Sequence, residues 1–202
     1  MAGGRASRMG GVEKAIVLLR DRPLISYVID ALLGSRNVGR VLIALSPRVP
    51  GTAGFIASRY AGEPRVVAIS TPGEGYVEDT AYAARAFGLD RPFLIIAADI
   101  PLVTPEIIDL AIAEYHGSGT EALSVRVDAG CVPPGIRPGI VLEDGGVPNV
   151  PAGINIVDGR LMDRYQRERV LIVREGRLAA NVNCAGDLAA CERILGGVGP
   201  NR

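Results

Sequence analysis

Short runs of aliphatic and β-branched residues alternate along this chain with longer stretches in which apolar residues recur every three or four positions. This alternation predicts strands that alternate with helices, and therefore βαβ units in an α/β domain with a mainly parallel sheet. The strongest strand signal covers residues 93–98, and further strands are expected at 41–45, 65–70, 121–127, 153–157 and 170–173. Helices are expected from Pro23 onward, after the loop at 46–51 to about Ala61, and over 77–87, 104–115 and 185–195.

The second half of the chain follows this pattern less regularly. Residues 129–149 are rich in proline and glycine and are expected to form a loop or a small excursion. An apolar run at 16–19 ends at the Arg20-Asp21-Arg22 turn. No repeat or linker divides the sequence, so we expect a single domain over residues 1–202.

Composition narrows the class of protein. The formal net charge is zero, which gives no basis for binding nucleic acid or an anionic membrane. No apolar run reaches the roughly 18–20 residues of a membrane span, and the amino end has no apolar signal segment, so a cytoplasmic protein is the expectation.

The three cysteines, Cys131, Cys184 and Cys191, have no metal-binding spacing and are expected to be ordinary core or surface thiols. The sequence does not decide the oligomeric state and is compatible with a homodimer.

The opening stretch, MAGGRASRMGGVEK, combines glycines with two cations. Gly3 and Gly4 allow backbone amides to approach a phosphate closely, and Arg8 and Lys14 supply positive charge. Lys14 is the single lysine among 22 basic residues. Drift toward arginine explains the excess of arginine but not the retained lysine, so we expect a compact ammonium group to matter here. The stretch matches neither the GxxxxGK[ST] nor the GxGxxG phosphate loop.

Four polar features follow expected strands or begin the chain: the opening loop, Ser46, the loop at 71–75, and Asp99. Because ligands bind beyond the carboxyl ends of strands in open parallel sheets, these features are expected to surround one site. Asp99 follows six apolar residues, and its carboxylate suits Mg²⁺, which takes one or two protein oxygens besides substrate phosphates. The alternative is an aspartate that forms the turn before the next helix.

Other candidate residues have two interpretations each. Asn183 precedes the last expected helix, where helix capping and metal ligation are equally compatible with an asparagine. Gly153 and Asn155 lie at a strand where the backbone could approach a ligand, but a β-bulge also explains the glycine. Gly73-Glu74-Gly75 is equally typical of a plain turn.

Residues 2–14 resemble the signature loop GGxxxRMGxxK of the MobA-like nucleotidyltransferases. Within that superfamily, GGVEK at 10–14, GEGYVEDT at 73–80, VPAGIN at 150–155 and NVNCAGDL at 181–188 resemble the archaeal guanylyltransferases of cobalamin assembly. The resemblance implies a Rossmann-like three-layer α/β/α sandwich of the nucleotide-diphospho-sugar transferase type. It also implies transfer of GMP from GTP to adenosylcobinamide phosphate, with Mg²⁺ as cofactor. The alternatives are a molybdenum cofactor guanylyltransferase, a sugar-phosphate nucleotidyltransferase, or a regulatory protein that binds nucleotide without catalysis.

The resemblance further assigns roles to residues. Arg8, Lys14 and Asp99 would be catalytic, and Asp99 and Asn183 would be metal ligands. The nucleotide would contact Ala2, Gly3, Gly4, Arg8, Lys14, Thr71, Gly73, Gly75, Gly153 and Asn155. An attacking phosphate monoester is already anionic near neutral pH and needs no strong base, which agrees with a sequence that contains a single histidine, His116.

A loop of this kind ordinarily follows a strand, whereas Met1 alone precedes Ala2 in this sequence. In the family that the chain resembles, a short apolar strand precedes the loop and lies in the middle of the sheet. Without it, the neighbouring strands would expose unpaired backbone groups inside the protein. We therefore expect the natural protein to carry several more apolar residues before Met1.

Overall fold

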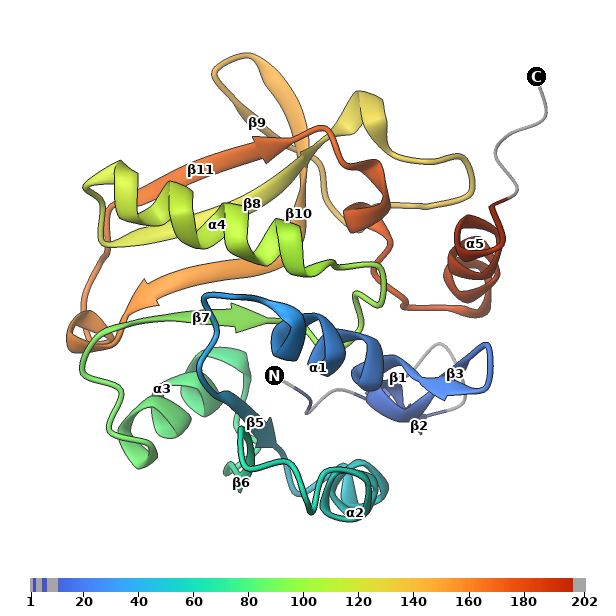
Figure 1. Cartoon of the computed structure of the whole chain (residues 1–202). Helices are drawn as coiled ribbons and strands as arrows, with labels where there is room; N and C mark the ends of the chain where they lie inside the picture. Colours follow the sequence, from blue (N-terminus) through green and yellow to red (C-terminus); the bar gives the residue numbers. More distant parts are fainter. Residues whose placement is uncertain (1, 3–4, 7–10, 198–202) are drawn as a thin grey trace.

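The computed structural model describes residues 2, 5–6 and 11–197 (Figure 1). Its helices are α1 (Leu24–Gly34), α2 (Pro50–Arg59), α3 (Tyr76–Ala86), α4 (Pro105–Ser118) and α5 (Ala185–Leu195). The longer strands are β5 (Val41–Leu45), β6 (Val66–Ser70), β7 (Pro92–Ile96), β8 (Ala122–Asp128), β9 (Leu142–Asp144), β10 (Val147–Asp158) and β11 (Glu168–Val173). Two small hairpins pair β1 (Arg5–Ala6) with β2 (Val12–Glu13), and β3 (Leu18–Leu19) with β4 (Arg22–Pro23).

Local sequence explains most of these elements. The expected strand at 41–45 and helix at 185–195 are confirmed at those boundaries, and the other expected helices and strands are present with shifts of a few residues. Proline occupies the first turn of α2 and α4, where its missing N–H has no helical partner to lose. Gly119 ends α4 in the left-handed conformation, with φ of 64°. The apolar run at 16–19 becomes a turn of 3₁₀ helix, η2 (Lys14–Ile16), followed by β3.

The α/β class is confirmed, but the sheet is mixed rather than mainly parallel. β5 and β6 are parallel, as are β8 and β11, whereas β10 runs antiparallel to β7, β8 and β9. The reversal comes from the region 129–149, where a loop was expected and a β9–β10 hairpin is found. Gly145 and Gly146 both have positive φ, which is what the two-residue turn of a tight hairpin requires.

The strands form two groups with helices around them. One group has the order β11-β8-β10-β7, and the other is the β5–β6 pair. The larger hydrophobic core lies between the first group and helices α1 and α4, and a smaller core joins β5 to α1 and α2. Figure 1 shows β5 and β7 facing each other across a gap, with α1 and α3 on opposite sides of it.

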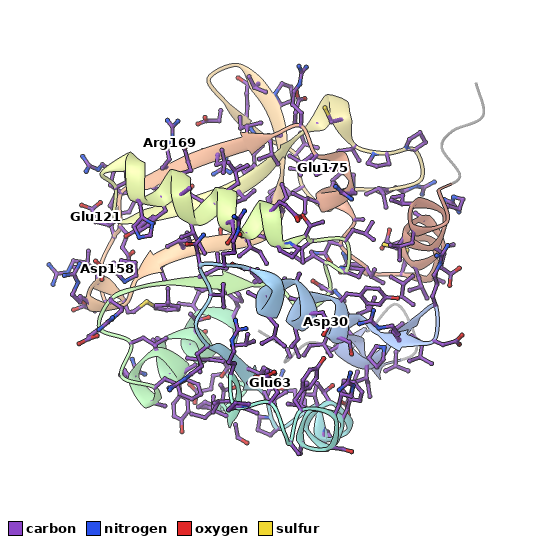
Figure 2. All side chains as sticks on the ribbon, viewed as in Figure 1. Asp30, Glu63, Glu121, Asp158, Arg169 and Glu175 are labelled. Atoms are coloured by element: carbon purple, nitrogen blue, oxygen red, sulfur yellow. The ribbon has the colours of Figure 1, made fainter. Side chains whose placement is uncertain are left out.

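Two charged pairs on the surface lie away from Asn183 and the helix that it precedes. Arg160 pairs with Asp158, and Arg167 with Glu121. Figure 2 shows Glu121 and Asp158 at the end of the molecule opposite α5, the helix that Asn183 precedes. No helix within the described residues is long and apolar enough to cross a membrane.

Candidate active site

Lys14, Asp99 and Asn183 meet in one cluster. The Lys14 Nζ lies 2.5 Å from Asp99 Oδ2 and 2.5 Å from Asn183 Oδ1, and donates a hydrogen bond to each. The side chains of Lys14 and Asp99 are only 17% and 15% exposed. Three residues that are far apart in the sequence therefore place one ammonium group and two side-chain oxygens at a single partly buried point.

Three different elements position these side chains. Lys14 begins η2, Asp99 follows β7, and Asn183 lies just before α5. The Val182 N–H donates to the Asp99 carbonyl at 2.9 Å, which fastens the segment before α5 to the end of β7. This bond holds the backbone of Asp99 next to the segment that carries Asn183.

The structure argues against the capping interpretation of Asn183, and metal ligation stays a prediction. Cys184 is the N-cap residue of α5, and the Asp187 carboxylate accepts hydrogen bonds from the Asn183 and Cys184 N–H groups at 2.8 and 2.9 Å. Capping of this helix therefore belongs to Cys184 and Asp187, and the Asn183 side-chain oxygen is directed to the Lys14 ammonium instead.

The second oxygen of Asp99 suits a cation. Asp99 Oδ1 is buried and has no hydrogen-bond partner among the described residues, although a buried carboxylate oxygen ordinarily has one. With Asn183 Oδ1 it forms a hard oxygen pair of the kind that Mg²⁺ accepts when substrate phosphates complete its shell. No group of three or more His, Cys, Asp and Glu side chains that could hold a metal occurs in the described part of the chain.

Glu13, the neighbour of Lys14, was not predicted to have a role. Its carboxylate accepts hydrogen bonds from the Gly51 N–H at 2.8 Å, the Thr52 N–H at 2.5 Å and the Thr52 hydroxyl at 2.7 Å. These groups belong to the first turn of α2, where exposed amides and the helix dipole favour a negative charge. Glu13 therefore fastens the loop that carries Lys14 to α2.

The expected loop at 71–75 lies beside the end of β5. Thr71 is buried, and its N–H donates to the Leu45 carbonyl at 2.8 Å. Gly73 has a φ of 78°, and a Cβ at this position would come within 2.9 Å of Pro47 Cδ, so glycine is required there. Gly75 is the N-cap residue of α3. The structure thus brings the loops after β5 and β6 together, as their position at strand ends predicted.

Two residues outside the predicted set hold this loop. The Asp79 carboxylate accepts from the Gly73 N–H at 2.8 Å, and the Arg48 guanidinium donates to the Gly73 carbonyl at 2.7 Å. Asp79 carried a signal in the sequence, because an acidic residue in the first turn of a helix commonly bonds free amides nearby. Arg48 carried none, since the contact depends on how two loops fold.

Gly153 forms the bulge that was one of its two interpretations. The pairing of β10 with β8 shifts between Pro151 and Ile154, and Gly153 has a φ of 73°. A Cβ on Gly153 would lie 3.2 Å from Ala97 Cβ, so this bulge is packed against the segment that leads to Asp99. Ligand contact by Gly153 stays a prediction.

Asn155 lies two residues farther along β10 and is hydrogen bonded to Tyr76, at the start of α3. Burial raises the pKa of the Tyr76 hydroxyl above its usual value, and the bond with Asn155 opposes that shift. Asn155 thus links β10 to the helix that follows the 71–75 loop, and its proposed contact with nucleotide stays a prediction.

The opening loop is described in part. Ala2 is buried and donates its N–H to the Ala44 carbonyl of β5 at 3.0 Å. Gly3, Gly4 and Arg8 lie outside the described residues, and their assigned roles stay predictions. Cys131, Cys184 and Cys191 are free cysteines; the first two are partly exposed, and Cys191 is buried.

The MobA-like NTP transferase domain family matches residues 1–190. The chain belongs to this family. It is 35% identical to adenosylcobinamide-phosphate guanylyltransferase of Methanocaldococcus jannaschii over 195 residues, which cover 96% of this chain and 95% of that relative. The nucleotidyltransferase family predicted from the opening motif is therefore confirmed.

Solved structures agree on the fold. A 4-diphosphocytidyl-2C-methyl-D-erythritol synthase of Anaerococcus prevotii matches with a TM-score of 0.69 at 11% identity, over 96% of this chain and 93% of that one. Molybdopterin-guanine dinucleotide biosynthesis protein A of Archaeoglobus fulgidus matches with a TM-score of 0.59 at 19% identity, over 96% of both chains. The predicted α/β fold of the nucleotide-diphospho-sugar transferase type is thereby confirmed.

Proposed function

We propose that this MobA-like protein transfers GMP from GTP to adenosylcobinamide phosphate. The observation that carries the proposal is the 35% identity to the guanylyltransferase of M. jannaschii, which extends over 96% of this chain. The likeness is therefore not confined to the phosphate-binding loop that many nucleotidyltransferases share, but includes the second half of the domain as well.

In the proposed reaction, an oxygen of the acceptor phosphate attacks the α-phosphorus of GTP. A new P–O–P bond forms, the bond from the α-phosphorus to the oxygen bridging to the β-phosphorus breaks, and pyrophosphate leaves. A phosphate monoester has a second pKa of about 6, so the attacking oxygen is already anionic at pH 7. The enzyme then needs to position the reactants and neutralise charge rather than remove a proton.

The placement of the single histidine supports a reaction without a histidine base. His116 lies in the last turn of α4 and packs against Tyr115. At 1.5 Å per residue, it is about 16 Å along the helix axis from Pro105, which begins α4 shortly after Asp99.

Lys14 is proposed to neutralise the triphosphate. Its ammonium already lies at the strand ends where the phosphates would bind, and a phosphate oxygen can replace Asp99 as its partner. Asp99 and Asn183 would hold Mg²⁺ through their side-chain oxygens. When bound, this ion neutralises and orients the phosphates. Arg8 is proposed to add a second positive charge on the same loop.

Pyrophosphate release from purified protein tests the acceptor. With GTP and Mg²⁺ present, we expect release with adenosylcobinamide phosphate and none with molybdopterin or a hexose 1-phosphate. Absence of pyrophosphate with the corrinoid acceptor would overturn the proposal, and release with molybdopterin would point to the molybdenum cofactor enzyme instead.

Variants test the site residues separately. We expect Lys14→Ala and Asp99→Ala each to lower turnover at least tenfold, equivalent to about 1.4 kcal/mol of transition-state stabilisation. Asp163→Ala is the matched control, because that aspartate is 81% exposed in a surface pair with Arg164. Near-normal turnover in both site variants would refute the assignment.

A further inference from the structure

The side-chain amide of Asn183 has two chemically different ends of nearly the same shape. Its Oδ1 accepts hydrogen bonds and can bind a metal ion, whereas its Nδ2 only donates. In the structure Oδ1 accepts from the Lys14 ammonium at 2.5 Å, so the oxygen faces the cluster that contains Asp99. Rotation of the amide by half a turn would place an NH₂ group there, and the cluster would lose the oxygen that Asn183 supplies.

Asn181 holds the other end of this amide. The Asn183 Nδ2 donates to the Asn181 carbonyl and to Asn181 Oδ1, both at 3.2 Å. An ammonium group only donates and a main-chain carbonyl only accepts, so Lys14 and the Asn181 carbonyl fix the same orientation of the amide from opposite ends. A rotated amide would bring Asn183 Oδ1 against the two oxygens of Asn181, and its NH₂ group against the Lys14 ammonium.

The backbone next to this amide is held in place as well. Val182, which separates the two asparagines, is fully buried, and its N–H donates to the Asp99 carbonyl at 2.9 Å. The Asp187 carboxylate accepts from the Asn183 N–H at 2.8 Å. These bonds hold residues 182 and 183 between Asp99 and the first turn of α5, and the orientation of the Asn183 amide is left to its side-chain partners.

The two side-chain partners of Asn183 differ in what happens to them when nucleotide binds. In the reaction proposed above, the Lys14 ammonium pairs with a phosphate oxygen once the triphosphate is present, and it then no longer holds Asn183 Oδ1. Asn181 keeps its hydrogen bonds to the Asn183 amide throughout. Outer groups that hydrogen-bond a metal ligand fix its orientation, and their loss commonly weakens metal binding by about 10–100-fold.

We propose that Asn181 is a positioning residue that keeps the oxygen of the Asn183 amide directed at the metal ion. This inference rests on the proposed function, because it takes Asn183 as a ligand of Mg²⁺. Asn181 acts through Asn183 and does not itself contact the ion. Because the Asn181 carbonyl remains in every variant, loss of the side-chain acceptor should weaken metal binding by about tenfold, at the lower end of the usual range.

Two variants of nearly equal size separate the acceptor from the bulk of the side chain. Asn181→Leu removes Oδ1, and Asn181→Asp keeps an acceptor oxygen in its place. The probe is Mn²⁺, which prefers the same oxygen ligands as Mg²⁺, together with a GTP analogue that carries a methylene group instead of the α,β-bridging oxygen and cannot release pyrophosphate. Calorimetry measures the affinity for this analogue with Mn²⁺ and, in EDTA, without metal; the ratio of the two affinities is the metal gain.

We expect Asn181→Leu to lower the metal gain about tenfold and Asn181→Asp to keep it within about threefold of the unmodified protein. An unchanged metal gain in Asn181→Leu would overturn the proposal, and so would an equal loss in Asn181→Asp. Asn181→Ala, which also lacks the acceptor, replaces Asn181→Leu if urea unfolding shows that the leucine variant does not fold.

A second background tests the orientation itself. In Asn183→Asp both ends of the side chain are oxygens, so rotation no longer matters, and Asn181 Oδ1 faces a carboxylate oxygen instead of a donor. We therefore expect Asn181→Leu in this background to leave the metal gain unchanged or to raise it. The same tenfold loss in both backgrounds would overturn the proposal, because a residue that only shapes the loop would act alike on asparagine and aspartate.

These measurements are independent of the acceptor in the proposed reaction. Failure to release pyrophosphate with the corrinoid would refute that reaction and leave the metal gain unaffected. Absence of a metal gain in the unmodified protein would refute metal ligation by Asn183, and the positioning role of Asn181 with it.

Discussion

Replacing Lys14 with methionine isolates what its charge contributes to the folded protein. Methionine keeps an unbranched apolar side chain but removes the ammonium group that lies 2.5 Å from Asp99 Oδ2 and from Asn183 Oδ1. Unit charges about 3 Å apart attract by roughly 5–6 kcal/mol at an effective dielectric constant of 20. Loss of solvation by both groups offsets most of that attraction, so the pair itself is not a large source of stability.

The cost of removing one partner is larger than the value of the pair, because Asp99 is then left as an uncompensated charge. Such a loss costs about 3–5 kcal/mol for fully buried pairs. The side chains of Lys14 and Asp99 are 17% and 15% exposed, and water that reaches Asp99 lowers the cost of leaving its charge unpaired. We therefore expect Lys14→Met to lower the free energy of unfolding by about 2–3 kcal/mol at pH 7.

Urea unfolding of Lys14→Met, Asp99→Asn and the double variant measures this effect as a double-mutant cycle. The double variant should recover at least about 1 kcal/mol relative to the sum of the two single losses, because the uncharged amide needs no ammonium partner. The reasoning is refuted if the free energy of unfolding of Lys14→Met is within about 0.5 kcal/mol of that of the unmodified protein, or if the losses of the two single variants are additive. Either result would show that the ion pair is not formed in solution.

Three further predictions concern groups outside this cluster. Glu13→Ala should lower the free energy of unfolding, measured by urea unfolding, by about 2 kcal/mol, because it removes the acceptor of three hydrogen bonds at the start of α2. Glu13→Gln keeps one acceptor oxygen and should lose clearly less stability. Equal losses in the two variants would contradict this prediction. The hydrogen bond from the Ser35 hydroxyl lowers the pKa of Asp109, so the stability that this carboxylate contributes is present at pH 7 and is lost as the pH falls through its folded-state pKa. The difference in unfolding free energy between the unmodified protein and Asp109→Asn should therefore shrink below about pH 4. A difference that stays constant with pH would contradict this prediction. Burial raises the pKa of Cys191 to about 12, so iodoacetamide at pH 8 should modify it only in urea, as read by peptide mass spectrometry; modification in the native protein would show that the thiol is accessible.

Features that depend on local pattern were predictable from the sequence. The strand at 41–45 and the helix at 185–195 follow from side-chain periodicity, because a residue's place on a buried or exposed face repeats along each element. Lys14, Asp99 and the 71–75 loop were identifiable because residue type and position at strand ends indicate phosphate and metal chemistry. The β9–β10 hairpin was missed although Gly145-Gly146 is a turn signal, since the many glycines and prolines around it favoured a loop.

The sequence by itself determined the elements of this protein and the residue types of its candidate site. Only the tertiary structure decided that Lys14 reaches across 85 positions to Asp99 and 169 positions to Asn183, and that Asp187, with Cys184, caps α5. It also decided that β10 runs antiparallel to β7, and that a cavity lies between β7 and β5. Periodicity reports which side of an element is buried, whereas strand order and long-range hydrogen bonds depend on which elements pack together. For that reason the sequence suggests a chemistry for the candidate site but not the geometry of that site.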